Sequence, residues 1–233
     1  QTPEYAMLRS LVGSEMCIRD RDGKLVKLVP MEAEEHAEAL FEANQLDTEG
    51  TNWAYLPYGP FADLKSYHSW VRENQGLEDP VFLAIVEKKS GRPLGIASYL
   101  RIHPAEGSIE VGHIHFSPLL QRTTSATESM FLMMQWAFEA GYRRYEWKCN
   151  ALNQASRRAA QRLGFSFEGI FRQMMIVKGR NRDTAWFAAI DSEWPALKTA
   201  FERYLDEKNF DEEGRPVTSL SCLLYTSPSP RDS

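Results

Sequence analysis

The sequence has little cysteine, no long apolar run and no excess of positive charge. Its 233 residues include only 3 cysteines, and no stretch reaches the ~18 consecutive apolar residues that a membrane-spanning helix needs. Lys and Arg number 27 against 32 Asp and Glu, a formal net charge of −5, which argues against the basic face of a nucleic-acid binder. Glycine (14) and proline (12) are too few for a collagen-like or low-complexity chain. We therefore expect a globular protein that binds neither nucleic acid nor membrane.

Both ends of the chain resemble translated sequencing-adapter DNA, over residues 10–21 and 222–233. The oligonucleotide GAGATGTGTATAAGAGACAG encodes the Glu-Met-Cys-Ile-Arg-Asp of residues 15–20, and its reverse complement encodes the Cys-Leu-Leu-Tyr-Thr-Ser of residues 222–227. We expect residues 1–21 and 222–233 to be non-native and the natural N-terminus to be missing. Cys149 is then the only native cysteine and cannot form an internal disulfide, so a reducing cytoplasm is the expected location.

The spacing of apolar residues and turns predicts one α/β domain over residues 22–191, followed by a helix and polar tail over 192–221. Because short turns join several strands, the sheet is expected to be mixed and mostly antiparallel, with flanking helices. Strands are expected at 24–29, 81–87, 94–102, 109–116, 144–149, 165–177 and 184–190, and helices at 31–44, 63–74, 124–140, 153–163 and 194–205.

Residues 117–127 (SPLLQRTTSAT) are a candidate anion-binding segment, because a strand ends there and small polar residues lead into a helix. The first turn of a helix leaves backbone N–H groups unpaired at its positive end. Small side chains would let a pyrophosphate approach these donors closely. An ordinary capped helix start is the alternative interpretation. The residues of this candidate site are Gln121, Arg122, Thr123, Thr124, Ser125, Ala126 and Thr127.

A second candidate segment, residues 150–165 (NALNQASRRAAQRLGF), also follows a strand. Asn153 and Ser156 lie just beyond the strand end, where sheet-and-helix folds bind ligands. Arg157, Arg158 and Arg162 surround them with positive charge suited to phosphate. The alternatives are a helix N-cap at Asn153 and a solvated charged face.

Together, LQRTTSATE after a strand and the NxxSxxxxxxLGF pattern resemble the GNAT N-acetyltransferase superfamily. IEVGHIHFSP and GFSFEGIFRQMMI resemble the fourth and sixth strands of its RimJ/RimL-like branch, which acetylates protein N-termini, amino acids and small amines. The resemblance implies acetyl-CoA as cofactor, with its pyrophosphate on the loop that begins at Gln121. Thr124 departs from the glycine that the family has there. The resemblance also implies that the sheet splays between its fourth and fifth strands (109–116 and 144–149).

Acetyl transfer to an amine needs a base for the amine and a proton donor for the departing thiolate. Ser156, which matches the N-x-x-S serine near the thioester, is the candidate donor, and Glu110 is the candidate base. A backbone N–H of the fourth strand around Phe116 would stabilise the oxyanion, and Ser117-Pro118 would make that strand diverge from the fifth. For Glu110, a structural ion pair is the alternative; His113, His115 or water are rival bases.

The remaining candidates concern the acceptor and other chemistry. Trp53, Tyr55 and Tyr58 would line the acceptor pocket or pack in the core. A metal at His113 and His115 would need His103 as a third ligand, so no metal is expected. Cys149 is expected to be a buried small hydrophobe.

The expected function is acetyl transfer from acetyl-CoA to a primary amine, in a small molecule or at a peptide N-terminus, by direct transfer in a ternary complex. The alternative is a non-catalytic acyl-CoA-binding module. The net charge of −5 suits a cationic acceptor, and the protein is expected to be a monomer or a homodimer.

Overall fold

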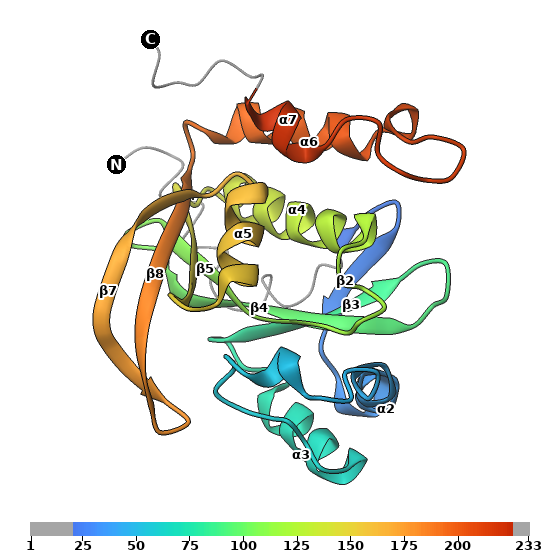
Figure 1. Ribbon diagram of the computed structural model, residues 1–233, viewed down its shortest axis with the longest axis vertical. Coiled ribbons are helices and arrows are strands. Elements are labelled where there is room, and N and C mark those ends of the chain that lie inside the picture. The colour runs from blue at the N-terminus through green and yellow to red at the C-terminus, as the bar shows by residue number, and fades with distance from the viewer. Residues whose placement is uncertain (1–20, 226–233) are drawn as a thin grey trace.

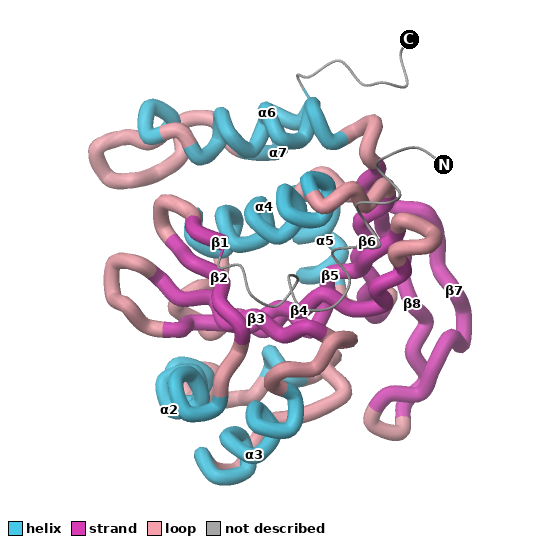
Figure 2. Tube along the Cα trace, turned by 180° about the vertical axis from the view of Figure 1, so that it is seen from behind, coloured by secondary structure: helices cyan, strands magenta, loops and turns pink. Residues whose placement is uncertain are grey.

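The predicted strands assemble into one eight-stranded sheet, which forms the middle layer of the molecule (Figures 1 and 2). The computed structural model describes residues 21–225. The sheet order is β1-β2-β3-β4-β5-β6-β8-β7, and all neighbours are antiparallel except β5 and β6, which are parallel. The strands are β1 Arg21–Asp22, β2 Val26–Pro30, β3 Val81–Glu87, β4 Pro93–His103, β5 Ser108–Phe116, β6 Arg144–Asn150, β7 Ser166–Val177 and β8 Arg180–Ile190. The prediction of a mixed, mostly antiparallel sheet is confirmed.

Helices cover both faces of the sheet, with α2 and α3 on one face and α4 and α5 on the other (Figure 1). α6 packs over α4, so this side has two helical layers. None of these described helices is long and apolar enough to cross a membrane. The helices are α2 Ala33–Asn44, α3 Leu64–Asn74, α4 Thr124–Glu139, α5 Gln154–Arg162, α6 Trp194–Leu205 and α7 Leu220–Tyr225, with 3-10 turns η1 Thr51–Trp53 and η2 Glu207–Asn209.

Local side-chain chemistry sets the helix ends where the sequence predicts them. The Asp63 side chain accepts a hydrogen bond of 2.7 Å from the backbone N–H of Ser66 and starts α3. Gly141 and Gly164 follow α4 and α5 with φ of 90°, a conformation that glycine adopts without steric cost. β8 begins at Arg180, whereas the sequence predicts that this strand starts at residue 184. The turn of the last hairpin is therefore shorter than predicted.

The core has two large parts, one on each face of the sheet, and a small third cluster of Val29, Ala84 and Val86. The cluster between the sheet and α4 and α6 contains the fully buried rings of Tyr145, Phe187 and Phe201. The cluster on the other face packs Trp53 and Tyr67 against the sheet. Most of β3 and the first part of β4 are therefore buried on both sides and form a closely packed support for the site.

β5 and β6 pair over only half of their length, which confirms the predicted splay. The parallel ladder joins residues 108–111 to 144–147 and then stops. At that point β5 has a bulge, in which residues 112–115 lie opposite residues 96–98 of β4 and His113 has a φ of 50°. Because a bulge bends its strand, the separation begins there and not at Ser117-Pro118, as the sequence suggested. The Ser117 N–H still bonds the Leu94 carbonyl of β4 at 2.9 Å.

Parts of the two terminal segments predicted to be non-native lie against the domain. Arg21 in β1 pairs with Leu28, and its guanidinium carbon lies 4.5 Å from the ring centroid of Trp136. Leu223 in α7 is 4% exposed. The rest of these segments, residues 1–20 and 226–233, lies outside the described residues. Their adapter origin stays a prediction.

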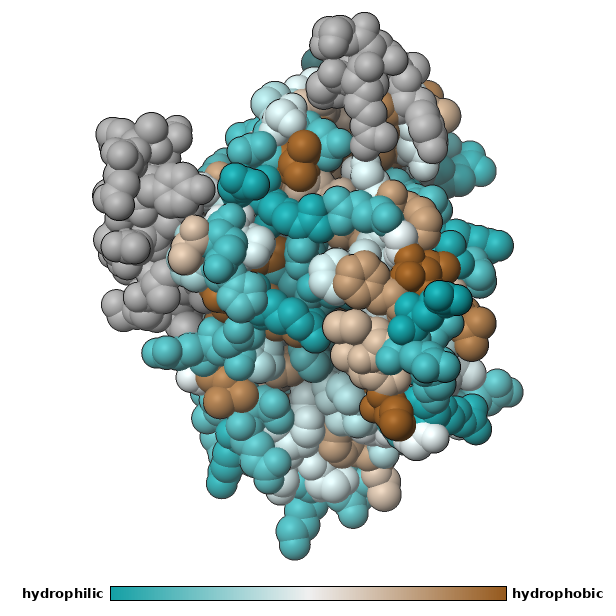
Figure 3. Space-filling model, turned by 90° about the vertical axis from the view of Figure 1, so that its left-hand side faces the viewer, coloured by the Kyte–Doolittle hydropathy of each residue, from teal (hydrophilic) through white to brown (hydrophobic). Residues whose placement is uncertain are grey.

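The edge strand β7 leaves a row of apolar side chains in solvent. Figure 3 views the molecule from this side, where apolar residues are interspersed with polar ones. The alternation along β7 turns Met175 and Val177 inward. The exposed apolar residues of this strand are 43–77% exposed and comprise Phe167, Ile170, Phe171, Met174 and Ile176.

Candidate active site

A pocket of about 350 Å³ lies where β5 and β6 separate. Residues 112–114 of β5 form one wall and residues 148–150 of β6 form the other. The start of α5, the loop before α3 and the β7–β8 hairpin complete it. Ser156, Asn153 and Glu110, three residues that the sequence nominates from separate segments, line this one pocket.

Ser156 is held at the pocket by two hydrogen bonds. Its backbone N–H bonds Asn153 Oδ1 at 3.1 Å, so Asn153 is the N-cap of α5 as well as a pocket residue. The indole Nε1–H of Trp147 donates to Ser156 Oγ at 3.0 Å. Because this bond uses one acceptor lone pair, the hydroxyl proton of Ser156 is left to be donated elsewhere.

Cys149 lines the same pocket but is a poor nucleophile. Burial raises the pKa of its thiol, although a hydrogen bond with Ser156 and the nearby Arg182 act in the opposite direction. The thiolate is the reactive form of cysteine. Cys149 therefore remains protonated near neutral pH, as its predicted role as a buried small residue requires.

Glu110 faces the pocket and is ion-paired, as the alternative interpretation expects, and its role as base stays a prediction. Its side chain is 3% exposed, with Oε1 2.7 Å from Arg101 Nη1 and Oε2 2.7 Å from Lys148 Nζ. Burial raises the pKa of the Glu110 carboxyl, while Lys148 and Arg101 limit that rise. Gly112 leaves room for the neighbouring Leu100 side chain, since a Cβ there would lie 2.8 Å from Leu100 Cδ2.

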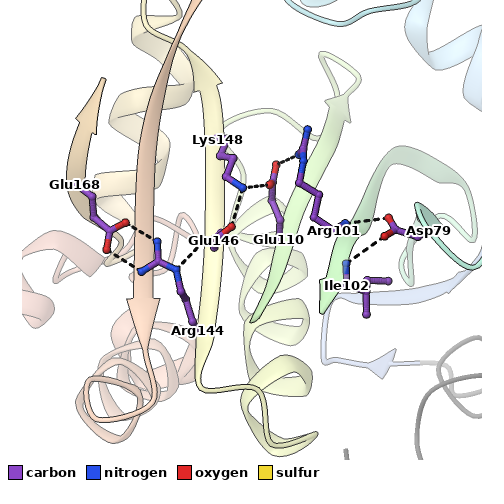
Figure 4. A network of polar contacts seen from close by, with 8 residues as sticks. All are labelled: Asp79, Arg101, Ile102, Glu110, Arg144, Glu146, Lys148 and Glu168. Carbon is purple, nitrogen blue, oxygen red and sulfur yellow. Dashed lines mark hydrogen bonds and ion pairs between the residues drawn. The ribbon is translucent and has the colours of Figure 1, made fainter. Parts of the chain in front are cut away.

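The ion pair of Glu110 belongs to a row of alternating charges that crosses the sheet (Figure 4). Lys148 Nζ also lies 2.7 Å from Glu146 Oε2, and Arg144 Nε bonds Glu146 Oε1 at 2.6 Å. Arg144 then reaches Glu168 of β7 at 2.9 and 2.5 Å. Burial acts to raise the pKa of Glu146, but the hydrogen bonds from Lys148 and Arg144 prevail and lower it.

A second bulge aims Arg101 at Glu110. Arg101 lies where the β4–β5 register shifts, and its φ is 47°. Asp79 fixes this backbone, because its carboxylate accepts the N–H of Arg101 at 2.9 Å and of Ile102 at 3.2 Å. Bulges commonly redirect a side chain in this way.

The two histidines of β5 pack on aromatic rings. His113 Nδ1 lies 3.2 Å from Tyr58 Oη, and the His115 ring stacks on Trp53 with centroids 3.7 Å apart. Burial lowers the pKa of each histidine from 6.5 to about 4. Both are therefore neutral near pH 7 and weak bases. Within residues 21–225, no group of three His, Cys, Asp or Glu side chains could hold a metal ion.

The three predicted acceptor residues divide between pocket and core. Tyr55 lines the pocket, and its hydroxyl lies 3.4 Å from the Leu152 carbonyl. Trp53 is 5% exposed and belongs to the core cluster beneath the loop. Tyr58 lies behind His113, and burial raises the pKa of its phenol above the usual range.

The predicted anion-binding segment forms the start of α4, outside the lining of this pocket. Thr123 is the N-cap, and its Oγ1 accepts the N–H of Ala126 at 3.1 Å. The N–H groups of Thr124 and Ser125 have no acceptor among the described residues, and both residues are only partly buried. Two donors are therefore available to a ligand at this helix end.

The other members of that segment have structural contacts. Gln121 Nε2 bonds the Phe116 carbonyl at 2.9 Å and Asn52 Oδ1 at 2.8 Å. Arg122 has a φ of 61° and is exposed. Thr127 is 1% exposed, and its hydroxyl accepts a bond of 2.9 Å from Arg162 of α5. This bond joins the start of α4 to the end of α5.

Several cationic residues of the site were not among the predicted ones. Lys148 could have been found, because the alternation in RYEWKCN places it on the same side of β6 as Arg144 and Glu146. Arg182 of β8 lines the pocket. Lys178, at the tip of the hairpin, donates to the carbonyls of Trp53 at 2.9 Å and Gly59 at 2.7 Å, which ties the hairpin to the aromatic loop. No short-range pattern indicates such a contact.

Comparison with known proteins agrees with this fold. Residues 26–166 match the acetyltransferase (GNAT) domain model. A GCN5-related N-acetyltransferase from Brucella melitensis is 44% identical, with a TM-score of 0.87 over 89% of this chain and 94% of that one. A probable GNAT-family acetyltransferase from Chromobacterium violaceum is also 44% identical, with a TM-score of 0.71 over 76% and 88% of the two chains.

The split-sheet fold is thus that of an acetyltransferase, and the chain belongs to the GNAT family. RimL, a ribosomal L7/L12 α-N-protein acetyltransferase, is 19% identical with a TM-score of 0.61 over 74% of this chain and 94% of that one. This likeness shows the fold alone. Among curated proteins, none matches the chain.

Proposed function

We propose that this protein transfers the acetyl group of acetyl-CoA to a primary amine, by direct transfer in a ternary complex. The observation that carries the proposal is the meeting of Ser156 and Glu110 in one pocket at the split between β5 and β6. A carboxylate and a hydroxyl on one pocket can serve as base and acid of the same reaction. That the chain belongs to the RimJ/RimL-like branch of the family remains a prediction.

The residues at the start of α4 fit the cofactor. The N–H groups of Thr124 and Ser125 have no acceptor among the described residues, and a diphosphate is the ligand that a helix N-terminus favours. Thr124, in place of the family's glycine, would have to turn its side chain away from that ligand. Bound acetyl-CoA would supply the acetyl group as a thioester.

The chain's own residues would move two protons. Glu110 would accept a proton from the acceptor ammonium, directly or through water, since its raised pKa makes it a stronger base than an ordinary glutamate. Ser156 would donate its hydroxyl proton to the departing sulfur, because Trp147 already occupies an Oγ lone pair. A backbone N–H of β5 near Phe116 would stabilise the oxyanion.

A thiol-release assay with acetyl-CoA and a panel of amines and peptides tests the proposal. Ser156→Ala should lower kcat by about 100-fold, the usual effect of losing a general acid, and should leave the Kd for acetyl-CoA unchanged. Ser90→Ala, in the exposed turn before β4, is the matched control. Unchanged turnover in Ser156→Ala would remove Ser156 from the mechanism.

The alternative, a non-catalytic acyl-CoA-binding module, has one observation in its favour. Two cations hold Glu110 at 2.7 Å each, which stabilises its carboxylate and weakens it as a base. Calorimetry with acetyl-CoA separates the two functions: binding without thiol release from any amine would favour the module.

A further inference from the structure

Arg182 is a cation of the pocket with no counter-charge of its own. It lies on β8 opposite Met175, and its side chain lines the pocket beside Cys149 and Glu110. Its Nε is buried and has no hydrogen-bond partner within residues 21–225. Arg182 is half-buried, and burying one of its N–H groups without a partner is costly, so this group favours an anionic ligand.

The cations of the charged row that ends at Glu110 are already neutralised. Arg101 and Lys148 share Glu110, Lys148 also bonds Glu146, and Arg144 bonds Glu146 and Glu168 (Figure 4). In this row three cations match three carboxylates, and Arg182 forms no ion pair with any described residue. Its charge is therefore available to whatever enters the pocket.

We propose that Arg182 binds a carboxylate on the acceptor, so that the acceptor's amine lies toward Glu110. A guanidinium binds a carboxylate through two parallel hydrogen bonds, which fixes orientation as well as position. The inference rests on the proposed function and narrows its substrate class. Under this proposal the acceptor carries a carboxylate, whereas the net charge of −5 suggested a cationic acceptor.

The rest of the wall suits a small acceptor with an apolar side chain. Leu56, Leu100, Met175 and Val177 surround the charged groups, and the volume of about 350 Å³ lies near the lower end for small-molecule sites. An apolar amino acid has the three required parts: an amine, a carboxylate and an apolar side chain.

Matched acceptors test the proposal by turnover. In the wild type, the kcat/KM for L-leucine should exceed that for L-leucinamide by about 10- to 100-fold. This ratio corresponds to the free energy of one hydrogen-bonded pair of charged groups. Arg182→Gln should bring the two acceptors to within about threefold and leave the Kd for acetyl-CoA unchanged. Arg182→Lys should restore part of the preference. Arg180→Gln, which changes an exposed arginine of the same strand, should keep the wild-type preference.

Calorimetry provides a readout that does not depend on turnover. N-acetyl-L-leucine should bind the wild type at least tenfold more tightly than its amide and should lose this advantage in Arg182→Gln. Equal binding of acid and amide to the wild type would overturn the proposal, as would loss of acetyl-CoA affinity in Arg182→Gln. A preference for phosphoethanolamine over leucine would overturn the carboxylate assignment.

The two proposals fail in different ways. Thiol release with neutral amines and no preference for leucine would overturn the carboxylate site and leave the acetyltransferase standing. Selective binding of N-acetyl-L-leucine without thiol release from any amine would support the carboxylate site and overturn the proposed reaction.

Discussion

The indole of Trp147 donates a hydrogen bond of 3.0 Å to the hydroxyl oxygen of Ser156. Trp147 is the last residue of β6 to pair with β5, so the bond fixes Ser156 where the two strands separate. The orientation of the candidate proton donor is therefore set by the sheet and not only by its own helix.

Trp147→Phe should lower kcat by about five- to tenfold, because it removes one neutral hydrogen bond while keeping an aromatic ring in the core. KM for acetyl-CoA should stay within about twofold. Steady-state kinetics check this, and the double variant with Ser156→Ala should be no slower than Ser156→Ala alone. Additive losses would mean that Trp147 acts independently of Ser156.

Lys148→Met should move the pH profile. kcat/KM rises with pH as the free enzyme's base loses its proton, and the pKa of Glu110 already lies above the ordinary 4.5. Lys148 lowers that pKa, so its removal should shift the acidic limb to higher pH. Lys198→Met, which removes a partly exposed lysine of α6 that is paired with Glu139, is the control. An acidic limb that does not move would exclude Glu110 as the titrating base.

Acid should destabilise the fold through the histidines of β5. The pKa of His113 and His115 falls from 6.5 in the unfolded chain to about 4 in the fold. Between these values the unfolded state binds more protons, so the free energy of unfolding falls as the pH drops from 6.5 to 4.

His115→Phe keeps a ring against Trp53 and removes one of these groups. Urea titrations of wild type and His115→Phe across that range should show a smaller loss of stability in the variant. Parallel curves would show that His115 does not contribute to the pH dependence.

Glu128 should be essential for holding β2 against α4. Its buried carboxylate accepts the N–H groups of Lys24 at 2.8 Å, Leu25 at 2.7 Å and Val26 at 2.8 Å. Glu128→Ala would leave three amides without their acceptor and should lower the free energy of unfolding by about 3 kcal/mol or more. Glu139→Ala, at the exposed end of the same helix, should cost less than about 1 kcal/mol. Equal losses in the two variants would contradict the role of Glu128.

The sequence predicts most of the fold because each element has local signals. Period-two and helical patterns place the main strands and helices, and Asp63, Asn153, Gly141 and Gly164 mark helix ends. The splay was also expected. Its cause was not, because the bulge at His113 depends on the register with β4, and no local pattern in IEVGHIHF reports that register.

Part of the site was also predictable, because some of its residues have local signals in the sequence. Ser156 and Asn153 follow from a motif on one helix start, and Glu110 from its place on a strand. The pairing of Arg101 with Glu110 depends on a positive φ within a bulge, and Lys178 reaches Trp53 across 125 positions of the chain. Contacts of this kind are set by tertiary geometry. Arg182 is identified by the lack of an ion pair, which only the surroundings reveal.

The most direct test of the central claim is a crystal structure of the protein with CoA and an N-acetylated amine. We expect the CoA sulfur between the separated halves of β5 and β6, within about 3.5 Å of Ser156 Oγ, with the amide nitrogen toward Glu110. A sulfur bound away from this gap, or a Ser156 hydroxyl with no contact to it, would contradict the account.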